Sequence, residues 1–237
     1  MQTSFARDML TRTQEGAAAL VRAVRPAVTG RDHLTLAALA AGETAAWSGL
    51  FTWRTLGSAA TVTAPVLLAL RPDCSPATRV GLIAAAVGQA AKRGTGSAPA
   101  QPSALGVASV SAQYAAFAWQ LRESHNDATG WGLRAGAWAA GVALARTRSE
   151  RLATAIAGVP AAALSALAGD PALRAADATQ GLSHGANLLL ASEAATVART
   201  RLEQHPVAGR LLAAGQSAAQ TVGLVLLVDG LARRGRR

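Results

Sequence analysis

The residues with the clearest potential for chemistry lie between positions 180 and 197, where an apolar run contains a single acid, Glu193. Four polar residues are spaced along the same run: Ser183, His184, Asn187 and Ser192. If this segment is a helix in a bilayer, each polar group needs a partner inside the protein, because water cannot reach it. An acid in such a place is a candidate proton donor or base.

The composition of the chain favours a bilayer as the surroundings of this segment. Of 237 residues, 51% are hydrophobic and only 15% are charged, whereas soluble domains carry about 25% charged residues. The charges gather near the N-terminus, in short interruptions, and in a group of arginines at the C-terminus. Between them lie apolar runs of roughly 12 to 25 residues, which are typical of a protein that crosses a membrane several times.

These runs predict an all-α fold, a polytopic transmembrane helix bundle of about eight spans. Proline-containing short connections favour one compact bundle, at residues 33–232. A basic segment at 1–32 precedes the bundle, and a basic C-terminal tail at 233–237 follows it. The expected spans are residues 33–53, 58–70, 79–91, 102–121, 130–145, 152–169, 178–198 and 207–232.

The positions of Lys and Arg predict an orientation for these spans. The side that holds both termini carries more Lys and Arg than the opposite side, and such an excess marks the cytoplasmic side of a membrane protein. The internal loops alone show the opposite bias, so the prediction depends on the two ends of the chain. We expect a multi-pass protein of the cell membrane with both termini in the cytoplasm.

The formal net charge of +10 raises the question of a nucleic-acid partner. Binding to nucleic-acid phosphates needs Lys and Arg clustered on one face. Here the basic residues flank apolar segments without an aromatic platform beside them. This pattern favours arginines at a lipid headgroup interface. We therefore expect a membrane lipid or lysophospholipid as partner and no nucleic acid, and the oligomeric state stays open.

The single cysteine, Cys74, excludes an intrachain disulfide and a cysteine-rich metal site, and we interpret it as a small packing residue. The sequence shows no zinc-ligand spacing, no phosphate-cradling glycine loop and no serine-nucleophile elbow. We therefore expect no metal and no cofactor. Glycines in the fifth expected span would let helices approach closely, although a composition bias explains them equally well: Gly132, Gly136 and Gly141.

Part of the segment described first resembles a known family. Residues 185–193, Gly-Ala-Asn-Leu-Leu-Leu-Ala-Ser-Glu, are similar to the glycine, apolar run and Ser-Asp signature of the lysoplasmalogenase-like integral membrane proteins, the YhhN family. Further along, Gln216 and the pair Ala219-Gln220 resemble that family's closing Tyr-x-x-Ala-Gln helix, with Gln216 at the tyrosine position.

The first half of the chain resembles the family more loosely. Residues 63–70 are similar to its Thr-Lys-Pro-Leu helix, and Gly88-Gln89 falls where the family has Gly-Asp. Residues 106–114 resemble its Gly-Leu helix, with Ala112-Gln113 in place of an Ala-His pair. The resemblance covers residues 61–231 and also implies eight spans, but the chain departs from the family at several polar signature positions.

The resemblance implies hydrolysis of the vinyl ether bond of a lysoplasmalogen, which releases a fatty aldehyde and a glycerophospho headgroup. This reaction needs a general acid that protonates the vinyl carbon and a second carboxylate that stabilises the resulting cation and activates water. The resemblance places Glu193 and Gln89 at the two catalytic positions. The residues expected to bind substrate are Gln113, Tyr114, His184, Asn187, Gln216 and Gln220.

Only one of the two catalytic positions holds an acid. Glu193 can donate or accept a proton, whereas the amide of Gln89 can only position a water or a substrate oxygen. The chain is therefore either a hydrolase in which another acid substitutes, or a non-catalytic relative that binds or stabilises lipid or another membrane protein. A small-substrate transporter is disfavoured, because the sequence shows no paired repeat.

Two further acids are candidates for the missing role. Glu43 lies within the first expected span and either faces the same cavity or pairs with His33 or Arg54 near the interface. Asp229 lies beside Arg233, where a headgroup-level ion pair explains it.

Helical spacing predicts which of the polar residues share a face. His184 and Glu193 are nine positions apart and therefore face in opposite directions, so that His184 is better interpreted as a hydrogen-bonding residue between helices. Gln216 and Gln220 are four apart and share a face. We expect these two glutamines to line one interior cavity with Gln89, Gln113 and Glu193.

Overall fold

The computed structural model describes residues 2–51, 54–91, 102–202 and 205–236, and this part of the chain is helical without strands, which confirms the all-α prediction. The helices are α1 (Gln2–Val28), α2 (His33–Phe51), α3 (Arg54–Ala69), α4 (Pro76–Ala91), α5 (Ala104–Gln120), α6 (Ala128–Leu144), α7 (Arg148–Ala168), α8 (Pro171–Ala175), α9 (Gln180–Arg201) and α10 (Pro206–Arg234).

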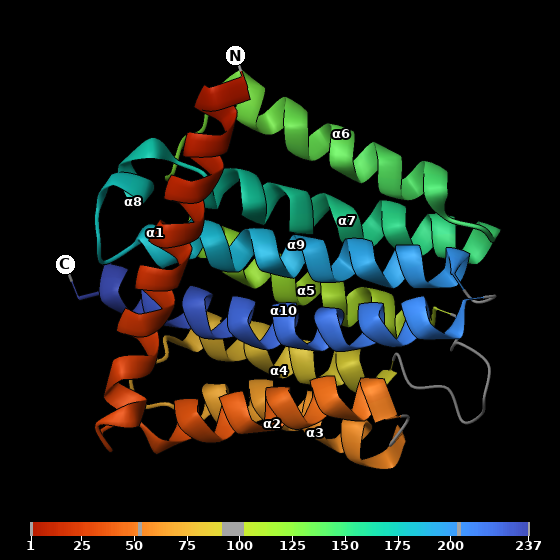
Figure 1. Ribbon diagram of the computed structural model, residues 1–237, viewed down its shortest axis with the longest axis horizontal. Helices are drawn as coiled ribbons and strands as arrows, with labels where there is room; N and C mark the ends of the chain where they lie inside the picture. Colours follow the sequence, from red (N-terminus) through yellow and green to blue (C-terminus); the bar gives the residue numbers. More distant parts are fainter. Residues whose placement is uncertain (1, 52–53, 92–101, 203–204, 237) are drawn as a thin grey trace.

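The eight predicted apolar segments each correspond to one long helix, α2 to α7, α9 and α10. These helices run up and down alongside one another in a single bundle (Figure 1). The most extensive packing is between α9 and α10, followed by α2 with α3, α4 with α5, and α10 with α2. The last helix therefore lies between the two halves of the bundle and joins them.

The basic N-terminal segment forms the helix α1, which crosses the other helices at one end of the bundle (Figure 1). Ala19, Ala23 and Ala27 are buried at intervals of four residues, so α1 rests on the bundle along one face. Both chain ends lie at this end of the bundle. The short helix α8 lies there too, in the connection between α7 and α9.

The residues predicted to form a C-terminal tail are in part an extension of α10. Arg233 and Arg234 occupy its last turn. The guanidinium of Arg233 donates to the carbonyl of Arg22 on α1 at 3.2 Å, and that of Arg234 donates to the carbonyl of Gln120 at 3.0 Å. These contacts fasten the end of α10 to α1 and α5.

Local sequence signals explain several helix ends. Asp127 accepts a hydrogen bond from the backbone N–H of Gly130 and caps α6. Thr147 and Glu150 form a reciprocal capping box at the start of α7. Pro76 and Pro206 begin α4 and α10, where a missing N–H leaves no helical hydrogen bond unmade.

Glycine allows α9 and α10 to approach each other closely. A Cβ atom added to Gly185 would lie 2.7 Å from the carbonyl oxygen of Gly223 and 2.9 Å from the backbone nitrogen of Leu227. At two glycines of the fifth expected span, the structure favours the composition bias over close helix packing. Nothing lies within 4 Å of a Cβ placed on Gly132 or Gly136. Their face of α6 points away from the other described helices.

This difference predicts opposite effects of the same substitution at two glycines. Gly185→Ala should destabilise the protein by about 1 to 3 kcal/mol, because two backbones must separate to admit the methyl group. Gly136→Ala should stabilise it by about 0.5 to 1 kcal/mol, because alanine is the better helix former and has open space around it. Thermal unfolding of the purified variants, followed by circular dichroism, measures both. Equal effects at the two sites would contradict the close packing of α9 on α10.

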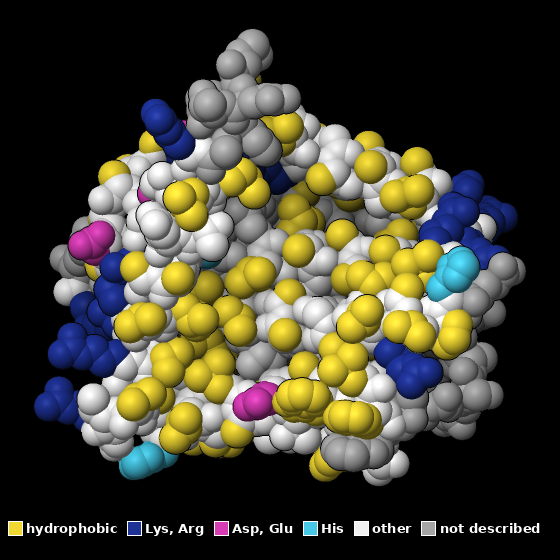
Figure 2. Space-filling model, in the orientation of Figure 1, with side chains coloured by type: hydrophobic (Ala, Val, Ile, Leu, Met, Phe, Trp, Pro, Cys, Tyr) yellow, Lys and Arg dark blue, Asp and Glu magenta, His cyan; other side chains and the backbone are white. Residues whose placement is uncertain are grey.

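One face of the bundle is apolar across its middle. Hydrophobic side chains cover the centre of the face in Figure 2, while Lys and Arg gather at its two edges. Within the described residues, two helices, α7 and α10, are long and apolar enough to cross a membrane, and α3 contains a shorter apolar stretch, Thr55–Ala69. Large side chains exposed on the long helices include Leu36, Phe51, Val66, Ile83, Trp119, Trp131, Leu133, Ile156, Val159 and Leu211.

Candidate functional site

The predicted catalytic acid Glu193 is held by a buried tyrosine. The hydroxyl of Tyr114, on α5, donates a hydrogen bond to Oε1 of Glu193, on α9, at 3.0 Å. Tyr114 is only 1% exposed, and Glu193 is half-buried. Two residues that lie 79 positions apart are thus brought together inside the bundle. The phenol fixes one carboxylate oxygen in place, which a proton-transferring group requires.

The amide of Gln113 lies beside this pair along α5. Gln113 is 1% exposed, and its Nε2 has no hydrogen-bond partner among the described residues. An unpaired buried donor is costly, so it marks a place where a ligand or water would be held. Gln89, on the neighbouring helix α4, is also buried, but within the described chain it makes no hydrogen bond to Tyr114 or Glu193.

The glutamines of α10 take part in a different set of contacts. Nε2 of Gln216 donates to Oγ1 of Thr196 at 2.9 Å, and the guanidinium of Arg199 donates to Oε1 of Gln216 at 3.1 Å. Gln220 is buried one turn further along. The side chain of Gln216 therefore links α10 to α9 through partners that the sequence did not identify.

His184 and Asn187 lie in a third place, at the end of the bundle crossed by α1. Both line a cavity of about 390 Å³. Oδ1 of Asn187 accepts a hydrogen bond from Oγ of Ser165 at 2.7 Å. His184 faces α1, where a Cβ on Gly16 would lie 3.1 Å from its Nδ1. As helical spacing predicted, His184 and Glu193 point to different neighbours.

A second hollow, an open groove of about 380 Å³, lies between α4 and α5 on their outer side. Its lining is apolar except for one serine: Val80, Ile83, Ala84, Val87, Ala108, Ser109 and Ala112. Gln89, Gln113, Glu193, Gln216 and Gln220 line neither of the two cavities. Their convergence on one interior cavity stays a prediction.

The two other candidate acids lie in separate environments. Glu43 is exposed on α2, where its Oε1 accepts a hydrogen bond from the indole of Trp47 at 3.3 Å. Asp229 forms an ion pair with Arg233 at 2.8 Å, which confirms the predicted pairing. Among the described residues, no group of three or more His, Cys, Asp or Glu side chains is placed to hold a metal ion.

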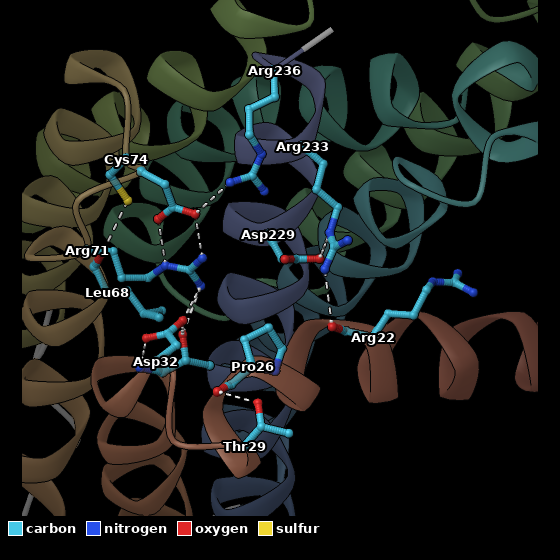
Figure 3. Close-up of polar contacts among 12 residues, drawn as sticks. Arg22, Pro26, Thr29, Asp32, Leu68, Arg71, Cys74, Asp229, Arg233 and Arg236 are labelled. Atoms are coloured by element: carbon cyan, nitrogen blue, oxygen red, sulfur yellow. Dashed lines mark hydrogen bonds and ion pairs between the residues drawn. The ribbon is translucent and has the colours of Figure 1, made fainter.

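Sequence reasoning missed a cluster of charged residues centred on Arg71, which is 6% exposed. Its guanidinium pairs with Asp73 at 2.8 Å and with Asp32 at 3.2 Å, and it also donates to Oγ1 of Thr35 at 2.8 Å (Figure 3). Arg236 approaches Asp73 at 3.7 Å. This Arg71 cluster ties the turn before α2 and the C-terminal end to the connection between α3 and α4.

Cys74 lies beside the Arg71 cluster and behaves as the predicted packing residue. It is buried, and its thiol donates a hydrogen bond to the carbonyl oxygen of Leu68 at 3.2 Å. Burial raises the pKa of Cys74 to about 11. The thiol is therefore protonated near neutral pH and is a poor nucleophile.

No protein-family model, curated protein or solved structure matches this chain. The resemblance to the lysoplasmalogenase-like family therefore depends on short motifs alone, which lie in residues 63–70, 88–89, 106–114, 185–193 and 216–220.

Proposed function

We propose that this chain is an eight-span membrane protein of the lysoplasmalogenase-like type, which binds lysophospholipids and cleaves the vinyl ether bond of lysoplasmalogens. The main observation in favour of this proposal is the distribution of apolar and basic side chains on the surface. Large apolar side chains are exposed on the long helices, and the face in Figure 2 is apolar across its middle with Lys and Arg at its two edges. A bilayer satisfies both features, because lipid tails cover the apolar band and headgroups meet the arginines.

The interior supports a role for Glu193 in this reaction. Protonation of the vinyl carbon produces an oxocarbenium-like cation, to which water adds at the carbon bonded to oxygen. The resulting hemiacetal collapses to a fatty aldehyde and the free hydroxyl of the glycerophospho headgroup. Glu193, positioned by Tyr114 at 3.0 Å, supplies a group that can move the protons. The open groove between α4 and α5 has an apolar lining on which a hydrocarbon chain can lie.

One observation favours the alternative of a non-catalytic lipid-binding relative. Glu193 accepts a hydrogen bond from the hydroxyl of Tyr114. The carboxylates of Glu43 and Asp229, the other two candidate acids, have partners elsewhere, Trp47 and Arg233. Gln89 occupies the position at which the family has its second acid and cannot transfer a proton. The same fold would then hold a lysophospholipid without cleaving it.

The test uses purified protein in detergent, incubated with lysoplasmalogen and, separately, with an ester lysophospholipid that has the same headgroup. We expect fatty aldehyde from the first lipid and no fatty acid from the second. Binding of both lipids without aldehyde release would establish the non-catalytic alternative. Absence of binding and of cleavage would overturn the proposed function, and extraction of the chain from membranes by alkaline carbonate would overturn its membrane-spanning placement.

A further inference from the structure

We propose that the cavity at the α1 end of the bundle is a binding site for a phosphate group, presented by a phospholipid headgroup or by a soluble phosphate ester. We call it the arginine cavity, because three arginines from three separate helices line it: Arg12 of α1, Arg134 of α6 and Arg174 of α8. The proposal of a phosphate site depends on this lining and not on the proposed function. The assignment to a lipid headgroup rests on the proposed function.

The arginine cavity carries an excess of positive charge. Within the described chain, none of these three arginines forms an ion pair. The arginines that do form ion pairs there, such as Arg71, Arg122 and Arg233, lie outside the cavity lining. The one carboxylate in the lining, Asp127, is engaged in capping α6. Glu15 of α1 lies near His184 at the same end and offsets part of the charge. With both acids counted, three guanidinium groups still exceed two carboxylates, which favours an anion and disfavours a cation.

In the described part of the chain, the cavity contains a buried hydrogen-bond donor without a partner and a second arginine that is fixed in position. Nε of Arg174 is buried and has no partner among the described residues, although buried guanidinium nitrogens are normally hydrogen-bonded. Arg134 is held in place, since it donates to the carbonyl of Gly130 at 3.1 Å and lies 3.4 Å from Oγ of Ser165. Asn187 has its oxygen occupied by the hydroxyl of Ser165. Its amide nitrogen is therefore the polar atom left to face a ligand.

Phosphate is the anion that suits this arrangement. A guanidinium donates two parallel N–H bonds to two oxygens of one phosphate, and the tetrahedral group can meet several arginines from different directions. A volume of about 390 Å³ accommodates a phosphate with its attached glycerol. The cavity lies at the end of the bundle that α1 crosses (Figure 1), where headgroups lie if the bundle spans a bilayer.

The test is titration calorimetry on the full chain in detergent with three probes: inorganic phosphate, glycerol 3-phosphate and lysophosphatidic acid. Monoacylglycerol, which has the chain without the phosphate, is the negative probe. We expect phosphate-containing probes to bind and monoacylglycerol to bind at least about tenfold more weakly than lysophosphatidic acid, since a charged hydrogen bond contributes a tenfold factor or more. Binding of lysophosphatidic acid alone among the three identifies a headgroup site. Binding of glycerol 3-phosphate as well identifies a soluble phosphate ester site.

Arg174→Gln and Arg12→Gln should each weaken phosphate binding about tenfold, because each removes one charged donor set. Arg12 is exposed, so its variant tests the site without risk to the fold. The matched control is Arg151→Gln, an exposed arginine in the first turn of α7 at the opposite end of the bundle, which should bind as the wild type does. Phosphate binding that is unchanged in both cavity variants, or equally weakened in the control, would overturn the inference.

The same variants separate this inference from the proposed function. Phosphate binding that depends on Arg12 and Arg174, without any vinyl ether cleavage by the wild type, would support the arginine cavity and count against the hydrolase. Vinyl ether cleavage with a substrate KM that neither variant changes would support the hydrolase and overturn the cavity as its headgroup site.

Discussion

Glu193→Gln should reduce vinyl ether cleavage by about 100- to 10,000-fold, the usual contribution of a general acid or base. The substitution keeps the size of the side chain and an oxygen that can accept the hydrogen bond from Tyr114, so the fold should be unaffected. It removes the titratable proton. Aldehyde release per enzyme, measured over time with saturating lysoplasmalogen, gives the change in kcat. Tyr114→Phe should lose less, about tenfold, because it removes only the positioning contact.

Glu43→Gln is the matched control for this loss. Glu43 is also a glutamate on a long helix, but it is exposed and bonded to Trp47, so its substitution should leave cleavage within about twofold of the wild type. Robust activity that survives Glu193→Gln and disappears in Glu43→Gln would place the chemistry on α2 and refute the role of Glu193.

Gln89→Asp extends this prediction to the position of the missing acid. If glutamine at this position limits the reaction, the aspartate should raise cleavage, by at most the 100- to 10,000-fold that general-acid catalysis contributes. Adding Glu193→Gln should then abolish the gain. A folded Gln89→Asp variant that shows no gain over wild type would favour the non-catalytic alternative.

Arg71→Ala should destabilise the protein by about 3 kcal/mol, one of the largest effects of any single substitution proposed for this chain. Removing one partner from a buried ion pair leaves the other charges without compensation, which typically costs about 3 to 5 kcal/mol. Arg71 is 7% exposed at its side chain, whereas Asp73 is 28% exposed and recovers some hydration, so the lower end applies. Denaturant titration of the solubilised protein measures the free energy of unfolding.

Arg122→Ala is the control for this experiment. Arg122 also pairs with an acid, Glu123 at 3.2 Å, but both side chains are more than half exposed. Exposed pairs contribute about 0 to 1 kcal/mol, so this variant should unfold close to the wild type. A loss in Arg122→Ala as large as that in Arg71→Ala would show that burial does not set the strength of these pairs.

The pH dependence of the Arg71 cluster provides a second measurement on the same variants. Burial alone would raise the pKa of Asp73, but the hydrogen bond and charge of Arg71 outweigh it and hold the pKa below its ordinary value. Stability from this group is therefore complete above the ordinary pKa of about 3.9 and is lost as the pH falls through the lower value in the folded protein. Arg71→Ala should remove this acid-dependent loss. An unchanged acid profile would contradict the contribution of the pair.

The sequence alone determined where eight of the described helices lie, α2 to α7, α9 and α10. Charge-free apolar runs bounded by arginines, prolines and capping residues are local features, and each of the eight predicted segments became one long helix. Proline at the first position of α10 and the Thr147–Glu150 capping box mark ends through chemistry within a few residues. The helix α1 was not predicted, because residues 1–32 were interpreted as a basic segment without a structure of their own. Its alanines at intervals of four residues, Ala19, Ala23 and Ala27, indicate a helix with one buried face.

The tertiary structure alone decided which polar residues meet. Glu193 and Tyr114 come from α9 and α5, the arginine cavity combines three helices, and Arg71 joins acids from two connections. Glycine spacing did not distinguish Gly185, packed on α10, from Gly136, which faces outward. The physical reason is that helical periodicity specifies which residues share a face, while the partner of that face depends on how each helix is rotated and packed. In alanine-rich helices, whose sides differ little in size or polarity, only the packed bundle fixes that rotation.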